Sequence, residues 1–188
     1  MDVYEKCPVI NGKSFEMRQT VMGDCADLLK VYSDEQSFEL FNGDNCHGDN
    51  FQYLTMERMA EAIAFWDASY RKKHFVRWSI IDRKISEAIG TIELFHRDAQ
   101  DAFTNTGLLR IDLRSDYERA ALIEEMLEMI VVPAYEWFEC NSLTTKAVSS
   151  AGERRKALHR MGFEESQNTI KGHCGEWFGD YFVRFGNA

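Results

Sequence analysis

The fold of this chain is decided by the segment 108–148, which reads LLRIDLRSDYERAALIEEMLEMIVVPAYEWFECNSLTTKAV. Residues 108–113 alternate between apolar and polar side chains, which is typical of a strand. Over about 117–140, apolar side chains recur on one helical stripe and glutamates lie opposite it. Residues 142–148 show a second strand pattern. A long helix between two strands predicts that the two strands are parallel neighbours in one sheet.

The rest of the chain adds strands and helices on either side of this crossover. The expected elements are a strand at 15–21, helices at 24–32 and 54–71, a hairpin of strands 75–81 and 85–95, a helix at 153–160, and two terminal strands that include 177–185. Together with the crossover they predict one α/β domain over residues 1–188. Its sheet is expected to be mixed, mostly antiparallel and seven-stranded, with four helices.

Composition and charge exclude several classes of protein. The chain has 188 residues, of which 45% are hydrophobic, enough for a single core. Its net charge of −9 disfavours a general binder of nucleic acid or of anionic membranes, since both need a basic face. The N-terminus is acidic and no apolar run approaches about 18 residues, so we expect a cytoplasmic protein without a signal peptide or membrane span.

The five cysteines are scattered without a CxxC pair, so we expect reduced thiols. Two neighbouring pairs, Cys46 with His47 and His173 with Cys174, carry residue types that ligate zinc. Neither pair has a partner pair at a familiar spacing. We therefore expect these to be loop or core residues and predict no metal site.

Four segments in this order resemble the GNAT acetyltransferase fold, in the branch that acetylates the N-termini of ribosomal proteins. They are 15–28 (FEMRQTVMGDCADL), 78–94 (WSIIDRKISEAIGTIEL), 113–127 (LRSDYERAALIEEML) and 157–166 (ALHRMGFEES). The resemblance spans nearly the whole chain. It implies an acyl-CoA-dependent N-acetyltransferase that moves an acetyl group from acetyl-CoA to an amine.

The resemblance also implies where acetyl-CoA would lie. Its pyrophosphate would meet the loop 114–121 at the start of the long helix, where free backbone amides favour anions. The rest of acetyl-CoA would occupy the cleft between strands 108–113 and 142–148. The implied cofactor-binding residues are Leu113, Arg114, Arg119, Ala120, Ala121 and Arg154.

The loop also departs from the family's pattern, because Arg119 and Ala121 stand where the family has glycines, and Glu118 adds a negative charge. Ser115 and Glu118 have the spacing of a capping box, which would use the helix amides internally. We therefore expect weakened binding of the cofactor.

Acetyl transfer needs a base for the amine and an acid near the departing sulfur. The candidate catalytic residues are Glu93, Asp112, Glu165 and Tyr181. Glu93 and Asp112 could equally be solvent-facing strand residues. His96 could serve as a base but is more typical of an exposed loop histidine.

Two functions of different classes follow from these patterns. The first is acetyl transfer to a peptide N-terminus or a small-molecule amine, and the acidic chain favours a cationic acceptor. The alternative is a catalytically impaired GNAT-fold binding or regulatory module, which the altered loop favours. A homodimer is possible because strand 177–185 would be an adhesive edge if left uncovered. The loops 42–50 and 96–106 would form the acceptor pocket.

Overall fold

The computed structural model describes residues 2–186 of the chain. The helices are α1 (Cys25–Tyr32), α2 (Met56–Arg71), α3 (Ala120–Trp137) and α4 (Gly152–Arg160). The strands are β1 (Ile10–Asn11), β2 (Phe15–Gln19), β3 (Val76–Asp82), β4 (Glu87–Arg97), β5 (Thr106–Leu113), β6 (Ser142–Lys146), β7 (Glu164–Glu165), β8 (Ile170–Lys171), β9 (Trp177–Phe178) and β10 (Tyr181–Phe185). Short 3-10 helices lie at Met22–Asp24, Phe38–Leu40 and Ser115–Tyr117. Within residues 2–186, no helix is long and apolar enough to cross a membrane.

Eight strands form one mixed sheet in the order β1-β2-β3-β4-β5-β6-β10-β7, and β8 pairs with β9 in a separate hairpin. Strands β5 and β6 are parallel, while the other pairs recorded for residues 2–186 are antiparallel. This confirms the predicted crossover through α3. The predicted count of seven strands is one too few, since the sheet has eight, with the two-residue strands β1 and β7 at its two edges.

The terminal pattern 177–185 does not form one continuous strand. Asp180 has a left-handed φ of 63°, which breaks the extended backbone between β9 and β10. Strand β10 then lies between β6 and β7. The condition for an adhesive edge is not met at Phe182 and Val183, because both pair with β7 on the outer side of β10.

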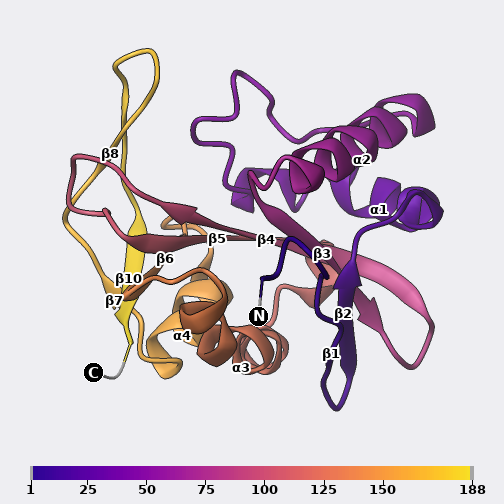
Figure 1. Ribbon diagram of the computed structural model, residues 1–188. Coiled ribbons are helices and arrows are strands. Elements are labelled where there is room, and N and C mark those ends of the chain that lie inside the picture. The colour runs from indigo at the N-terminus through magenta and orange to yellow at the C-terminus, as the bar shows by residue number, and fades with distance from the viewer. Residues whose placement is uncertain (1, 187–188) are drawn as a thin grey trace.

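The sheet separates two helical layers (Figure 1). On one side α3 and α4 cover an apolar face, where Trp78, Ile92 and Leu109 pack in one cluster with Ile123 of α3. On the other side α1 and α2 form a second cluster that includes Tyr32 and Trp66 and leaves part of the sheet face uncovered. That uncovered part holds the candidate site.

Helix α3 begins at Ala120, three residues later than predicted, because Ser115–Tyr117 first forms a 3-10 turn. The predicted capping box of Ser115 and Glu118 is wrong, since within the described residues no side chain of this turn caps the helix. The amide of Ala120 instead donates to Glu153 Oε2 of α4, at 2.9 Å. The start of α3 is thus capped from another helix.

Gly90 is expected to tolerate no side chain. A Cβ at this position would meet the backbone carbonyl of Asp112 and approach Leu113 Cδ2 to 2.6 Å. We expect Gly90→Ala to lower the free energy of unfolding by about 2–3 kcal/mol in urea denaturation. The matched control is Gly152→Ala, where nothing lies within 4 Å of the new Cβ and the stability should stay level or rise. Equal effects of the two substitutions would contradict this account of the β4–β5 contact.

Candidate functional site

Two rows of polar side chains cross the sheet on the face toward α1 and α2. Strand register places them side by side: Arg77, Glu93 and Arg110 in the first row, and Ser79, Thr91 and Asp112 in the second. Residues two apart in a strand share a face, so the rows alternate with apolar residues that point toward α3. A buried polar network on this side of the sheet is the result.

Glu93 is the centre of the first row and is only 2% exposed. Its two oxygens accept hydrogen bonds from Arg77 Nη2 and, at 2.7 Å, from Arg110 Nη1. Burial alone would raise the pKa of Glu93, but the two guanidinium groups outweigh it and hold that pKa below its usual range. The carboxylate is therefore ionised and fully engaged, which leaves it poorly placed to take a proton from a ligand.

Asp112 lies in the second row, beneath the layer formed by Tyr32. Its Oδ2 accepts from Tyr32 Oη at 2.8 Å and from Arg77 Nη1 at 3.2 Å, while Oδ1 has no partner among the described residues. Burial raises the pKa of Asp112, and Arg77 and Tyr32 offset this only in part. Both Glu93 and Asp112 are about 2% exposed, so the interpretation of them as solvent-facing strand residues is wrong.

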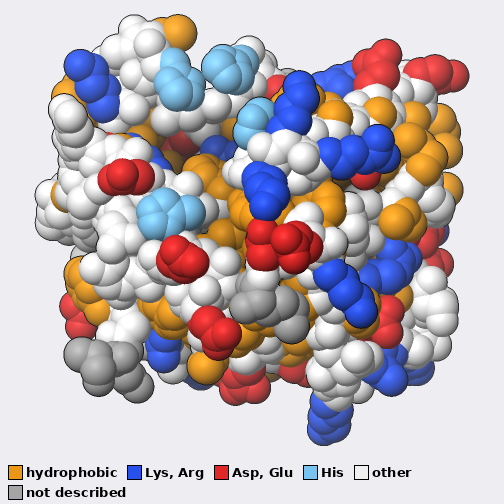
Figure 2. Space-filling model, viewed as in Figure 1, with side chains coloured by type: hydrophobic (Ala, Val, Ile, Leu, Met, Phe, Trp, Pro, Cys, Tyr) orange, Lys and Arg blue, Asp and Glu red, His pale blue; other side chains and the backbone are white. Residues whose placement is uncertain are grey.

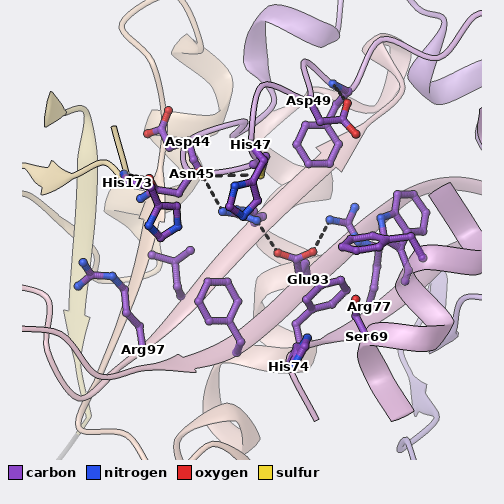
Figure 3. A pocket seen from close by; sticks show the side chains of 18 of the residues that line it. Asp44, Asn45, His47, Asp49, Ser69, His74, Arg77, Glu93, Arg97 and His173 are labelled. Carbon is purple, nitrogen blue, oxygen red and sulfur yellow. Dashed lines mark hydrogen bonds and ion pairs between the residues drawn. The ribbon is translucent and has the colours of Figure 1, made fainter. Parts of the chain in front are cut away.

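A cavity of about 840 Å³ lies over the first row, between the 44–53 loop, α2, the ends of β4 and β5, and the β8–β9 hairpin. Figure 3 shows Glu93 at its floor with a hydrogen bond to each side, and His47 and His173 next to each other across the opening. Its volume is within the range of small-molecule sites. Segments from both predicted pocket loops, 42–50 and 96–106, contribute to its lining.

Tyr181 of β10, the strand next to β6, also lines this cavity. Its hydroxyl donates to Asp44 Oδ2 at 2.8 Å, and the same carboxylate accepts from Lys146 Nζ at 2.7 Å. Burial, and then the charge of Asp44, raise the pKa of Tyr181 far above its usual range. Tyr181 is thus a neutral hydroxyl at the cavity wall.

The remaining candidates for catalysis are engaged elsewhere. Glu165 is exposed on β7, outside the cavity lining, and pairs with Arg155. His96 belongs to the lining, but its Nδ1 donates to the carbonyl of Phe138 at 2.6 Å, since a carbonyl can only accept. Of the four predicted catalytic residues, the structure brings Glu93 and Tyr181 to one cavity and places Asp112 beneath it.

The predicted cofactor-binding residues surround the start of α3. Leu113 is fully buried in the core toward α3, and Ala121 is exposed on the helix. Arg114 pairs with Asp116 at 2.7 Å and lies near Glu87. Arg119 is exposed at the N-cap of α3. The structure therefore keeps these residues near the start of α3. Arg114 is already engaged by carboxylates.

The backbone amides of the loop, which a pyrophosphate would need, are mostly taken by the protein itself. Ser115 N donates to Asp34 Oδ2 at 2.8 Å, Glu118 N and Arg119 N donate to carbonyls of the 3-10 turn, and Ala120 N donates to Glu153. Two carboxylates, Glu118 and Glu153, stand beside the helix start. An anion would meet both repulsion and a shortage of donors here.

The cleft between β5 and β6 is filled as well. The two strands pair only as far as Leu109 and Thr145, and they diverge beyond that point. Arg154, 1% exposed, forms an ion pair with Glu118 and donates to the carbonyl of Leu40 at 2.8 Å.

The segment 34–44 covers this divergence. Besides the contacts of Asp34 with the loop and of Leu40 with α4, Asp44 binds Lys146 at the end of β6, and its carbonyl accepts from Arg110 of β5 at 2.8 Å. We call the segment 34–44, together with Glu118, Glu153 and Arg154, the closure. In the conformation described here, the residues at the implied place of acetyl-CoA do not fit a pyrophosphate.

Sequence patterns missed Asp44 and Glu153, since each acts on a distant partner. Asp44 lies in a loop without periodicity, and Glu153 reads as an ordinary first-turn acid of a helix. The patterns also treated Cys46–His47 and His173–Cys174 separately, whereas the rings of His47 and His173 stack with centroids 5.3 Å apart. Within residues 2–186, no group of three metal-ligating side chains is arranged to hold a metal ion.

Comparison with known proteins supports this architecture. No family model and no curated protein sequence matches the chain. Many solved structures match the chain, and three of them illustrate the similarity. A GNAT-family acetyltransferase from Bacillus anthracis aligns with a TM-score of 0.69 and 10% identity over 95% of this chain and 98% of that one. The ribosomal-protein-S5-alanine acetyltransferase from Vibrio fischeri gives 0.68 and 12% over 95% and 96%. Mycobacterium smegmatis RimJ, solved with CoA-disulfide, gives 0.69 and 13% over 94% and 85%.

At these identities the comparisons establish the fold. The chain has the GNAT fold, as its sequence resemblance implied, and the solved structures similar to it include a ribosomal-protein-S5-alanine acetyltransferase.

Proposed function

We propose that this chain is an N-acetyltransferase, which binds an amine-bearing organic molecule in the cavity and acetylates it from acetyl-CoA once the closure has opened. One observation carries the proposal: the cavity adjoins the point where β5 and β6 diverge. Arg110 on its floor directly follows the last paired residue of β5, and Tyr181 in its wall pairs with Lys146 of β6. A ligand in this cavity would lie next to the divergence of β5 and β6, where the resemblance implies that acetyl-CoA binds.

In this proposal the chain's own residues hold the acceptor. Aromatic side chains exclude water from the cavity, and the Arg77–Glu93–Arg110 row fixes its floor. The Tyr181 hydroxyl donates to Asp44 until the closure opens; it would then protonate the leaving sulfur and regain a proton from the amine nitrogen. Acetyl-CoA would supply the acetyl group. A cytoplasmic location and a homodimer stay predictions from the sequence.

A second candidate function has its own support in the closure. A GNAT-fold module that binds a ligand without acetyl transfer would keep the cavity and would have no need of a free helix start. The hydrogen bond from Ala120 to Glu153 favours this candidate.

Turnover separates the two candidates. Purified protein is incubated with acetyl-CoA and a panel of amines and N-terminal peptides, and acetylated products are measured by mass spectrometry. We expect product with the wild type and about 10²-fold less with Tyr181→Phe, which removes the proton donor but keeps the ring. Val183→Ala, on the same strand but outside the cavity lining, is the control. Absence of product from every acceptor would favour the binding module, and equal turnover by Tyr181→Phe would exclude this tyrosine as the acid.

A further inference from the structure

The charge of the cavity lining differs from that of the chain. The chain carries 31 acidic and 22 basic residues. The lining holds four of the acidic residues, Asp44, Asp49, Glu93 and Asp98, and five of the basic ones, Arg58, Arg77, Arg97, Arg110 and Lys171. Its formal charge is therefore +1, against −9 for the whole chain. Figure 2 shows cationic and histidine side chains gathered around a hollow on this face. The acidity of the sequence thus says little about the cavity.

Every carboxylate in the lining already has a donor. Asp44 accepts from Lys146 and Tyr181, Asp49 from Arg58 and Tyr53, Glu93 from Arg77 and Arg110, and Asp98 from Thr104. To pair with an ammonium group, Asp44, Asp49 and Glu93 would each have to give up a cationic partner, and only the exposed Asp98 has a neutral donor. Desolvating a cation without a partner costs several kcal/mol. The lining therefore disfavours the cationic acceptor expected from the sequence.

Some hydrogen-bond donors of the lining, in contrast, have no acceptor. Lys171 forms no ion pair among the described residues and lies over the ring of Trp177, with Nζ 6.0 Å from its centroid. The buried Nε atoms of Arg77 and Arg110 have no hydrogen-bond partner within residues 2–186. The surplus of donors over free acceptors favours a ligand that brings acceptor oxygens.

The walls of the cavity are aromatic. They include the rings of Phe51, Tyr53, Phe65, Trp66, Phe75, Phe95 and Tyr181. Phe65 is 64% exposed, although it is a large apolar side chain at the mouth. Such a lining gains free energy by covering an apolar, ring-sized body.

We propose that the ligand of this cavity is an organic carboxylate with an apolar, ring-sized body, whose carboxylate lies toward Lys171 at the mouth. Where the proposed acetyl transfer holds, the inference rests on it and narrows the acceptor: the reactive amine belongs to a molecule that also carries a carboxylate. The chemical class is thus that of an aromatic or aliphatic amino acid or a similar organic acid.

Binding of three matched probes, without acetyl-CoA, tests the inference. The probes are 3-phenylpropionate, 3-phenylpropanol and 3-phenylpropylamine, which share one body and differ in the terminal group. Each is titrated by calorimetry near neutral pH and low salt. We expect the carboxylate to bind about tenfold or more tighter than the amine, with the alcohol between them. We also expect Lys171→Gln to weaken the carboxylate about three- to tenfold and to leave the alcohol unchanged.

The control variant is Lys84→Gln, which removes a lysine from the β3–β4 turn outside the cavity lining. It should change none of the three affinities. Amine binding equal to or tighter than carboxylate binding would overturn the inference. So would carboxylate binding that Lys171→Gln leaves unchanged, or no binding of any probe at about 10 mM. Since no probe requires acetyl-CoA, failure of the proposed transfer would appear only in the turnover assay.

Discussion

Replacing Arg77 with methionine is expected to lower the free energy of unfolding by about 3–5 kcal/mol, because the change leaves two buried carboxylates without their main cationic partner. Arg77 is itself 2% exposed and contacts Glu93 through Nη2 and Asp112 through Nη1. It also donates to Tyr32 Oη at 2.9 Å, and its guanidinium carbon lies 4.2 Å from the centroid of the Trp66 ring. The Arg77 side chain thus links the sheet to α1 and α2.

Urea denaturation at neutral pH measures this loss. Arg71→Met is the control, since Arg71 pairs with Asp67 on the surface of α2 and is 75% exposed. Such a pair contributes at most about 1 kcal/mol. The double variant Arg77→Met/Glu93→Gln should recover about 1–2 kcal/mol, because it removes one of the stranded charges. A loss below about 1 kcal/mol in the single variant would mean that the network contributes little.

The same variant should show a defined pH dependence. In the wild type the folded-state pKa of Glu93 is depressed by Arg77 and Arg110, so its stabilisation is present above the unfolded pKa and is lost as the pH falls through the folded one. Without Arg77 the pKa of Glu93 should rise and that of Asp112 should rise further. The stability difference between wild type and Arg77→Met should therefore widen from about pH 4 to about pH 7.

The layer order and the crossover could be predicted because local periodicity carries them. Alternation along 108–113 and the stripe of α3 depend on neighbours only a few residues away. The positions of Glu93 and Asp112 on strands identified them as candidates, but did not predict that both are buried. Three strands must be in register before Arg77 and Arg110 can be seen on either side of Glu93.

The closure could not be predicted for a different reason. Its contacts join residues that are 33 to 114 positions apart, as in Ala120 with Glu153 and Leu40 with Arg154. The segment 34–44 has no periodic pattern that indicates what it covers. The loss of glycines from the loop did indicate a changed helix start. The capping box predicted for Ser115 and Glu118, however, is not what caps the helix. The carboxylate that caps α3 comes from another helix.

Opening the start of α3 is expected to produce the largest change in affinity for CoA. We expect weak binding to the wild type, with a dissociation constant of about 1 mM, and a gain of about 10- to 100-fold by Glu118→Gln/Glu153→Ala, to about 10–100 µM. Each carboxylate removed relieves about 1 kcal/mol of repulsion toward a pyrophosphate. Glu153→Ala also frees the Ala120 amide. The Glu118→Gln change keeps a side-chain oxygen that can accept from Arg154, so the buried guanidinium retains a partner.

Calorimetry with CoA and with inorganic pyrophosphate checks this prediction, with Glu164→Ala as a control that removes an exposed carboxylate on β7. Tighter binding of both CoA and pyrophosphate by the double variant alone would locate the obstacle at the helix start. Gain of pyrophosphate without CoA would locate a second obstacle in the segment 34–44, since the rest of CoA must pass between β5 and β6. Tight CoA binding by the wild type, unchanged in the double variant, would contradict the closure, because the same amide cannot serve Glu153 and a phosphate at once.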